Sequence, residues 1–222
     1  MTEQELPLQD RRDAGQRLAQ RLRGHVGTSA LVLGLPRGGV PVAAEIAHAL
    51  GVALDVIVVR KLGVPGHEEF AMGAIASDGV QVLDAPFIRR MGLDERRLES
   101  VIDHERHELE RREHAFRGNQ AYPTLTGRQV VLVDDGIATG ATMRAAIRAV
   151  RRLGAEHCIL AVPVAAPESL ASLRPEVDHI ECLAAPENFA SVGQWYRHFD
   201  QTSDAEVRAC LRSAHDAGAA EE

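Results

Sequence analysis

The chain has 222 residues, of which 45% are hydrophobic and only 4% aromatic, so one α/β domain with a core of Val, Leu, Ile and Ala is expected. The formal net charge of −7 argues against a general nucleic-acid binder. Apolar runs stay shorter than a membrane span, the start "MTEQELPLQDRRD" has no signal-peptide pattern, and three cysteines are widely spaced, so we expect a cytoplasmic protein with no membrane contact.

Strands alternate with helices along most of the chain. Short apolar runs that end in Gly, Pro or acidic residues predict buried strands over 30–35, 54–59, 129–133, 157–162 and 179–183. Apolar positions at helical spacing predict helices over 10–23, 40–51, 141–154 and 168–173. This order predicts an α/β fold, with a parallel sheet of about five strands flanked by helices.

Two segments interrupt the alternation. The stretch from Arg60 to Phe70 is predicted to be a loop, and a hairpin with its turn at Asp78-Gly79 is predicted to follow it. The segment 94–117 is rich in charged residues, so we expect a long, mostly solvated helix, inserted as an arm. Its thin apolar stripe consists of Leu98, Val101, Ile102, Leu109 and Phe116.

The stretch "VVLVDDGIATGAT" ends a predicted strand in two acids, Asp134 and Asp135. Ligands of parallel sheets bind beyond the carboxyl ends of the strands, where two carboxylates can accept hydrogen bonds from vicinal sugar hydroxyls or help to hold a hydrated Mg²⁺. The loop 137–142 offers backbone N–H groups, two hydroxyls and a helix N-terminus, which suit a phosphate monoester. The spacing fits a ribose 5-phosphate; the alternative is an acidic strand end before a capped helix.

This stretch resembles the phosphoribosyl pyrophosphate (PRPP) binding motif of the type I phosphoribosyltransferases, and is closest to its adenine-type form. The agreement extends from about residue 31 to 200. The resemblance implies a five-stranded parallel sheet with a mobile hood, and a Mg²⁺-dependent transfer of ribose 5-phosphate from PRPP to a nitrogen acceptor. It divides the chain into an N-terminal hood segment (1–27), a core (28–184) with a helical insertion at about 85–120, and a C-terminal hood segment and tail (185–222).

The resemblance also assigns the binding residues. Asp134 and Asp135 would bind the ribose, and "LPRGGVP" and "RKLGVPG" would meet the pyrophosphate. Lys61, the single lysine of the chain, and Arg37 would stabilise the leaving group in catalysis, together with the two acids. The alternatives are an ordinary turn at Gly38-Gly39 and a surface lysine. The 5′-phosphate would contact Ala138, Thr139, Gly140, Ala141 and Thr142, and the pyrophosphate Arg37, Gly38, Gly39, Arg60 and Lys61.

The acceptor is not identified by the sequence. Ala138 stands where hypoxanthine-guanine types carry an acid, which argues against those bases and leaves the proton acceptor unassigned. Phe189, Trp195 and Tyr196 are candidates to stack on a base, although Trp195 fits an anchor of the C-terminal segment equally well. A non-catalytic PRPP- or nucleotide-binding regulator of the same fold is the main alternative. A phosphohydrolase is disfavoured because neither a nucleophile nor a metal cluster is evident, and a homodimer stays open.

Overall fold

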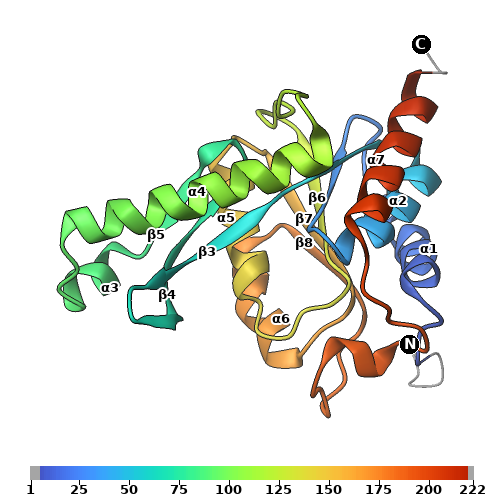
Figure 1. Cartoon of the computed structure of the whole chain (residues 1–222). Helices are drawn as coiled ribbons and strands as arrows, with labels where there is room; N and C mark the ends of the chain where they lie inside the picture. The colour runs from blue at the N-terminus through green and yellow to red at the C-terminus, as the bar shows by residue number, and fades with distance from the viewer. Residues whose placement is uncertain (1–5, 220–222) are drawn as a thin grey trace.

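The fold is built on a parallel sheet whose strands run in the order β2-β1-β6-β7-β8 (Figure 1). The computed structural model describes residues 6–219, without the side chains of 68–70 and 215–219. Nearly all residues of the central strands are buried, because helices cover both faces. The predicted five-stranded parallel sheet is therefore confirmed. Its strands are β1 (Leu31–Gly34), β2 (Ala53–Val56), β6 (Gln129–Val133), β7 (His157–Val164) and β8 (His179–Ala184).

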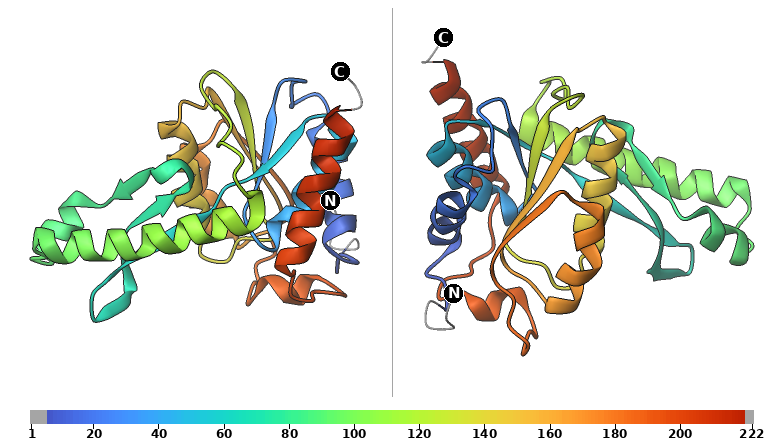
Figure 2. Two further views of the ribbon diagram at one scale, coloured as in Figure 1. Left: turned by 45° about the horizontal axis from the view of Figure 1, so that its top comes forward. Right: turned by 180° about the vertical axis from the view of Figure 1, so that it is seen from behind.

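Two layers of helices enclose this sheet (Figure 2). One layer contains α1 (Arg11–Leu22), α2 (Gly39–Leu50) and α7 (Asp204–Ala219), and the other contains α5 (Ala141–Arg152) and α6 (Pro167–Leu173). The helices predicted near 10–23, 40–51, 141–154 and 168–173 are confirmed, whereas the sequence analysis did not predict α7. Among residues 6–219, no helix combines the length and apolar character that crossing a bilayer requires.

The chain leaves the parallel sheet after β2 and forms a second, antiparallel sheet. Its strands are β3 (Val59–Val64), β4 (His67–Ala76) and β5 (Gln81–Leu83). The predicted loop from Arg60 to Phe70 is wrong, because both halves of this segment pair as strands around a turn at Gly66, whose φ is +81°. The predicted turn at Asp78-Gly79 is confirmed, with φ of 59° and 69° at these two residues.

A helical arm lies along this second sheet (Figure 1). It consists of α3 (Ala85–Arg90) and α4 (Glu95–Arg117). The long charged helix is confirmed, and three residues of its apolar stripe are buried against β3, β4 and the helical layer that contains α7. These residues are Ile102, Leu109 and Phe116. The stripe is thus largely used to fasten the arm to the rest of the chain.

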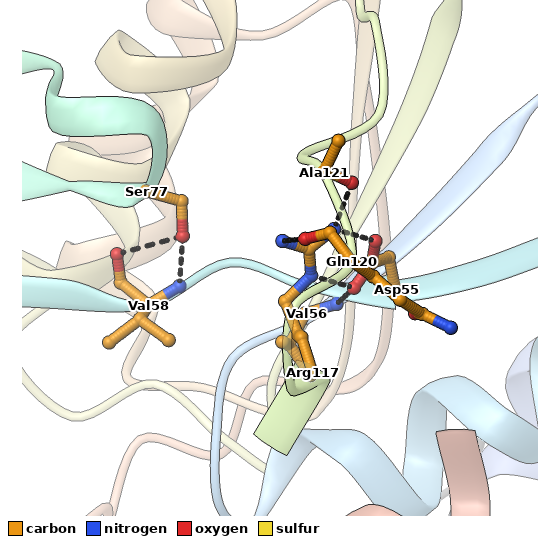
Figure 3. A network of polar contacts seen from close by, with 7 residues as sticks. All are labelled: Asp55, Val56, Val58, Ser77, Arg117, Gln120 and Ala121. Atoms are coloured by element: carbon orange, nitrogen blue, oxygen red, sulfur yellow. Dashed lines mark hydrogen bonds and ion pairs between the residues drawn. The ribbon is translucent and has the colours of Figure 1, made fainter. Parts of the chain in front are cut away.

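A buried ion pair ties the end of α4 to β2 (Figure 3). Arg117 donates from Nε to Asp55 Oδ1 at 2.8 Å and from Nη2 to Asp55 Oδ2 at 2.9 Å. The two side chains are only 6% and 10% exposed. Arg117 also donates to the carbonyl oxygens of Gln120 and Ala121, so its whole guanidinium is engaged. The arm is therefore fixed at its base by a charge pair that solvent screens poorly.

Removing one partner of this pair leaves a buried charge without compensation. We expect Arg117→Met to lower the free energy of unfolding by about 3–5 kcal/mol, because the Asp55 carboxylate loses its counter-charge. Urea unfolding followed by circular dichroism measures this loss.

The matched control is Arg111→Met, which removes an exposed arginine on the same helix that is paired with Glu108. The control is expected to leave the unfolding midpoint unchanged within error. Equal, small effects of the two substitutions would contradict an anchoring role for Arg117.

Candidate active site

The candidate site lies where the connections of the parallel sheet change direction. From β1 the chain passes through α2 to β2 on one side, and from β6 it passes through α5 to β7 on the other. The carboxyl ends of β1 and β6 are adjacent, and the amide of Leu35 donates to the carbonyl of Val133 at 2.8 Å just beyond them. Such a switch point leaves a crevice between two diverging loops, the usual ligand site of open α/β sheets.

Asp134 and Asp135 stand at this point, both half-buried. The amide of Asp135 donates to Asp134 Oδ1 at 2.9 Å, and the hydroxyl of Tyr196 donates to the Asp135 carbonyl at 2.6 Å. Arg11 donates from Nε to Asp135 Oδ2 at 2.9 Å, and its Nη2 forms an ion pair with the same oxygen at 2.8 Å. Each acid thus uses one carboxylate oxygen, and in the described part of the chain no N–H or hydroxyl donates to the second.

The loop between β1 and α2 approaches the acids closely at two glycines, Gly38 and Gly39. Gly38 has helical φ and ψ of −63° and −33°, so it is not required for an unusual backbone conformation. A Cβ atom there would overlap the carboxylate of Asp135, and one on Gly39 would lie 2.6 Å from the carbonyl oxygen of Val133. The amide of Gly39 donates to the Leu35 carbonyl. Gly38 and Gly39 therefore permit close packing of two loops, and their contact with a pyrophosphate stays a prediction.

The loop after the acids presents unsatisfied donors. Gly140 has φ of +74° and turns the chain into α5. The amide of Ile137 donates to the Val164 carbonyl, and the Ile137 carbonyl accepts from the amide of Ala166, both at 2.9 Å. Ser169 Oγ donates to the Ala138 carbonyl at 2.5 Å. Within residues 6–219, no group accepts from the amides of 138–142, as is normal for a helix start. The hydroxyl-bearing Thr139 and Thr142 are exposed beside them.

The expected pyrophosphate contacts are dispersed. Arg37, which follows a cis peptide bond, lies 3.5 Å from Asp204 of α7, with both side chains well exposed. Arg60 and Lys61 are neighbours on β3 and point to opposite faces of the strand. Arg60 pairs with Glu105 of α4 at 2.6 Å, whereas Lys61 is exposed and forms no ion pair with any described acid. The structure brings neither residue of β3 onto the acid pair.

The candidate base-binding residues are part of the C-terminal segment. Tyr196 is buried, its ring lies 4.9 Å from that of Phe199, and its hydroxyl holds the backbone of Asp135. Trp195 is half-buried against the core, and its indole Nε1 has no acceptor among the described residues. Phe189 packs half-buried on the same core cluster. Their contact with a base stays a prediction.

Electrostatics separate the two acids. Burial and the charge of the adjacent Asp135 raise the pKa of Asp134 well above its usual range, whereas the charge of Arg11 acts in the opposite direction. Burial also raises the pKa of the Tyr196 hydroxyl, which therefore keeps its proton at neutral pH. An Asp134 carboxylate that is ionised in the ligand-free protein consequently costs folding free energy.

This cost predicts opposite effects of substituting the two acids. Folding raises the pKa of Asp134. The residue therefore stabilises the folded state fully at a pH below its unfolded-state pKa, and this stabilisation is lost as the pH rises through its folded-state pKa. At pH 8 we therefore expect Asp134→Asn to raise the melting temperature by at least ~2 °C, the shift that about 1 kcal/mol produces in a chain of this size.

In Asp135→Asn the melting temperature should fall instead, because Arg11 loses its counter-charge. Differential scanning fluorimetry from pH 4 to pH 8 measures both variants, and the gain in Asp134→Asn should shrink toward pH 4. A melting temperature that falls at pH 8 in Asp134→Asn as well would contradict the raised pKa.

The chain is similar in sequence to known proteins. A family described as the phosphoribosyl transferase domain matches residues 6–193. A protein of Mycobacterium tuberculosis with the provisional name phosphoribosyl transferase is 50% identical over 206 residues, which cover 93% of this chain and 46% of that protein. The chain thus spans about half the length of the curated relatives that it matches most extensively.

Solved structures show the same fold. The crystal structure of TT1426 from Thermus thermophilus is 42% identical, with a TM-score of 0.84, and the match covers 93% of this chain and 98% of that one. A Neisseria gonorrhoeae protein with bound ppGpp has a TM-score of 0.50 at 12% identity, over 96% of this chain and 93% of its own, which is a likeness of fold alone. With a family match that spans residues 6–193 and includes both loops of the switch point, this chain belongs to the phosphoribosyl transferase family.

Proposed function

We propose that this chain transfers ribose 5-phosphate from PRPP to a nitrogen base, with release of pyrophosphate. The observation that carries the proposal is the pairing of two features at one switch point. An acid pair in which one carboxylate oxygen of each acid accepts from no described N–H or hydroxyl directly precedes a loop whose amides have no acceptor among the described residues. Sugar hydroxyls need acceptors and a phosphate needs donors, so one ribose 5-phosphate satisfies both sets.

The phosphate site follows from backbone geometry. Its donors are the amides of 138–142, assisted by the hydroxyls of Thr139 and Thr142 and by the positive end of the α5 dipole. Small side chains leave the loop accessible, and the bond from Ser169 to the Ala138 carbonyl holds it in place. Specificity for a monoester comes from this ring of donors rather than from a basic side chain.

The two carboxylates also suit a Mg²⁺ ion. No cluster of three His, Cys, Asp or Glu side chains fit to hold a metal occurs in the described residues. Mg²⁺ commonly binds through one or two carboxylates plus substrate phosphates and water. The carboxylates of Asp134 and Asp135 are hard oxygen ligands of this kind, so they would help to hold an ion carried by PRPP, directly or through its water, and the ion would supply charge neutralisation for the pyrophosphate.

In the reaction, the bond from C1′ of the ribose to the pyrophosphate oxygen breaks, and its electron pair leaves with that oxygen. The acceptor nitrogen forms the new bond to C1′, and its proton passes to the departing pyrophosphate or to water. The ribose gains positive charge as the old bond breaks, and two carboxylates beside its hydroxyls favour that charge. Catalysis then depends on positioning and electrostatics, with Arg37 and Lys61 proposed to meet the departing pyrophosphate.

Incubation with Mg²⁺–PRPP and a panel of bases, followed by assay of pyrophosphate release, tests this function. Release that depends on one base is expected. Hypoxanthine and guanine should be poor substrates, because Ala138 provides no acid for proton exchange with the base. Binding of PRPP without release for any base would favour the regulator, and absence of binding would contradict both.

Ligand-induced stabilisation tests the ribose site separately. At a hundredfold excess over the dissociation constant, Mg²⁺–PRPP should stabilise the chain by about 2.7 kcal/mol. The double substitution Asp134→Asn with Asp135→Asn should remove most of this gain while the ligand-free protein still unfolds cooperatively. A ligand response that survives in the double variant would disprove the ribose assignment.

Lys61 provides a prediction about the chemical step. If its ammonium contacts mainly the departing pyrophosphate, Lys61→Ala should lower kcat by about 10²-fold or more, with a smaller change in the KM for PRPP. Its place on β3, away from the acid pair, requires the β3–β4 hairpin to move toward the ligand during turnover. Arg60→Ala is the matched comparison, since Arg60 is engaged by Glu105 on the opposite face. Full kcat in Lys61→Ala, with only KM raised, would show a ground-state contact.

A further inference from the structure

We propose that Arg11 is a positioning residue for the ribose-binding acid pair, which it keeps in a conformation that leaves one oxygen of Asp135 open to the ligand. This inference rests on the proposed function, since the ligand in question is PRPP. It concerns a residue of the first turn of α1, 124 residues away in sequence from the acid that it contacts.

The contact between Arg11 and Asp135 is one-sided. Nε donates to Oδ2 at 2.9 Å, and Nη2 lies 2.8 Å from the same oxygen as its ion-pair partner. No N–H or hydroxyl group of the described residues donates to the other oxygen, Oδ1. A carboxylate held by one oxygen in this way keeps a fixed orientation and still offers a complete acceptor, which a bidentate arginine pair would not do.

Arg11 is itself held on several sides. Its Nη1 donates to the Asp200 carbonyl at 2.7 Å, and its guanidinium carbon lies 4.0 Å from the centroid of the Phe199 ring. The side chain is 12% exposed. A stacked and hydrogen-bonded guanidinium has lost most of its rotamer freedom before any ligand arrives, so it can fix the orientation of its partner.

The residues that hold Arg11 also reach the acid pair. The ring of Phe199 packs on Tyr196, whose hydroxyl donates to the Asp135 carbonyl, and a Cβ atom on Gly193 would lie only 2.9 Å from Phe199. The C-terminal segment therefore supports Asp135 twice, once through its backbone and once through Arg11. This arrangement gives both chain ends a direct effect on the ribose site.

Charge explains why an arginine is needed at this position. Two adjacent carboxylates repel each other, and Gly38 limits how far the Asp135 carboxylate can turn away. A guanidinium on the far oxygen offsets this repulsion and keeps Oδ1 turned away from Arg11. Contacts to the ribose hydroxyls form in the ground state and persist in the transition state, so losing the orientation should weaken PRPP binding more than it slows the bound complex.

A double-mutant cycle on the full chain tests the inference. The dissociation constant of Mg²⁺–PRPP is measured by isothermal titration calorimetry for the parent, Arg11→Met, Asp135→Asn and the double variant. We expect Arg11→Met to raise it about tenfold or more and to leave kcat within about threefold, because hydrogen bonds to charged groups are among the strongest in proteins. In the Asp135→Asn background, Arg11→Met should have little further effect.

A milder series keeps the test decisive if Arg11→Met is poorly folded. Arg11→Lys retains the charge and loses the fork, so an intermediate loss of affinity is expected. Arg12→Lys and Arg12→Met, at the exposed neighbouring arginine of the same helix, should bind PRPP as the parent does. Additive effects in the cycle, or an Arg11→Lys variant equal to the parent in affinity, would overturn the positioning role. A parent that fails to bind Mg²⁺–PRPP would overturn the proposed function itself, and this inference with it.

Discussion

Two carboxylates next to each other at the end of a buried strand cost free energy, and much of the surrounding structure offsets that cost. Burial and mutual repulsion raise the pKa of Asp134. Arg11 supplies the opposite charge on Asp135, and Tyr196 fixes its backbone. The close approach of Gly38 leaves no room for a side chain that would displace the acid. A site whose ligand-free form costs folding free energy is typical of binding sites that trade stability for function.

The antiparallel extension serves a different purpose from the parallel sheet. The chain passes directly from β2 into β3, and the pair of Asp55 and Arg117 fastens the end of α4 to β2 (Figure 3). The hairpin of β3 and β4 is therefore anchored at its base and extends away from the parallel sheet (Figure 1).

Most of the fold and the central motif could be predicted from the sequence, because the spacing of apolar residues and the residue types found in turns are local signals. The run from Val130 to Thr142 specifies a strand, an acidic end and a helix start within thirteen neighbouring residues. The strand character of 60–70 was missed, because Gly and Pro interrupt its apolar pattern while its burial depends on α4. Arg11 was missed for a stronger reason: its contacts with Asp135 and Asp200 span 124 and 189 residues, and nothing local distinguishes it from Arg12.

The central claim is that one ribose 5-phosphate is held between the acid pair and the loop before α5. A crystal structure of the chain with PRPP and Mg²⁺ tests it most directly. The account predicts the two ribose hydroxyls within hydrogen-bond distance of Asp134 and Asp135, the 5′-phosphate on the amides of 138–142, and Arg11 still on Asp135 Oδ2. A ligand whose phosphate lies elsewhere, or whose hydroxyls avoid both acids, would contradict it.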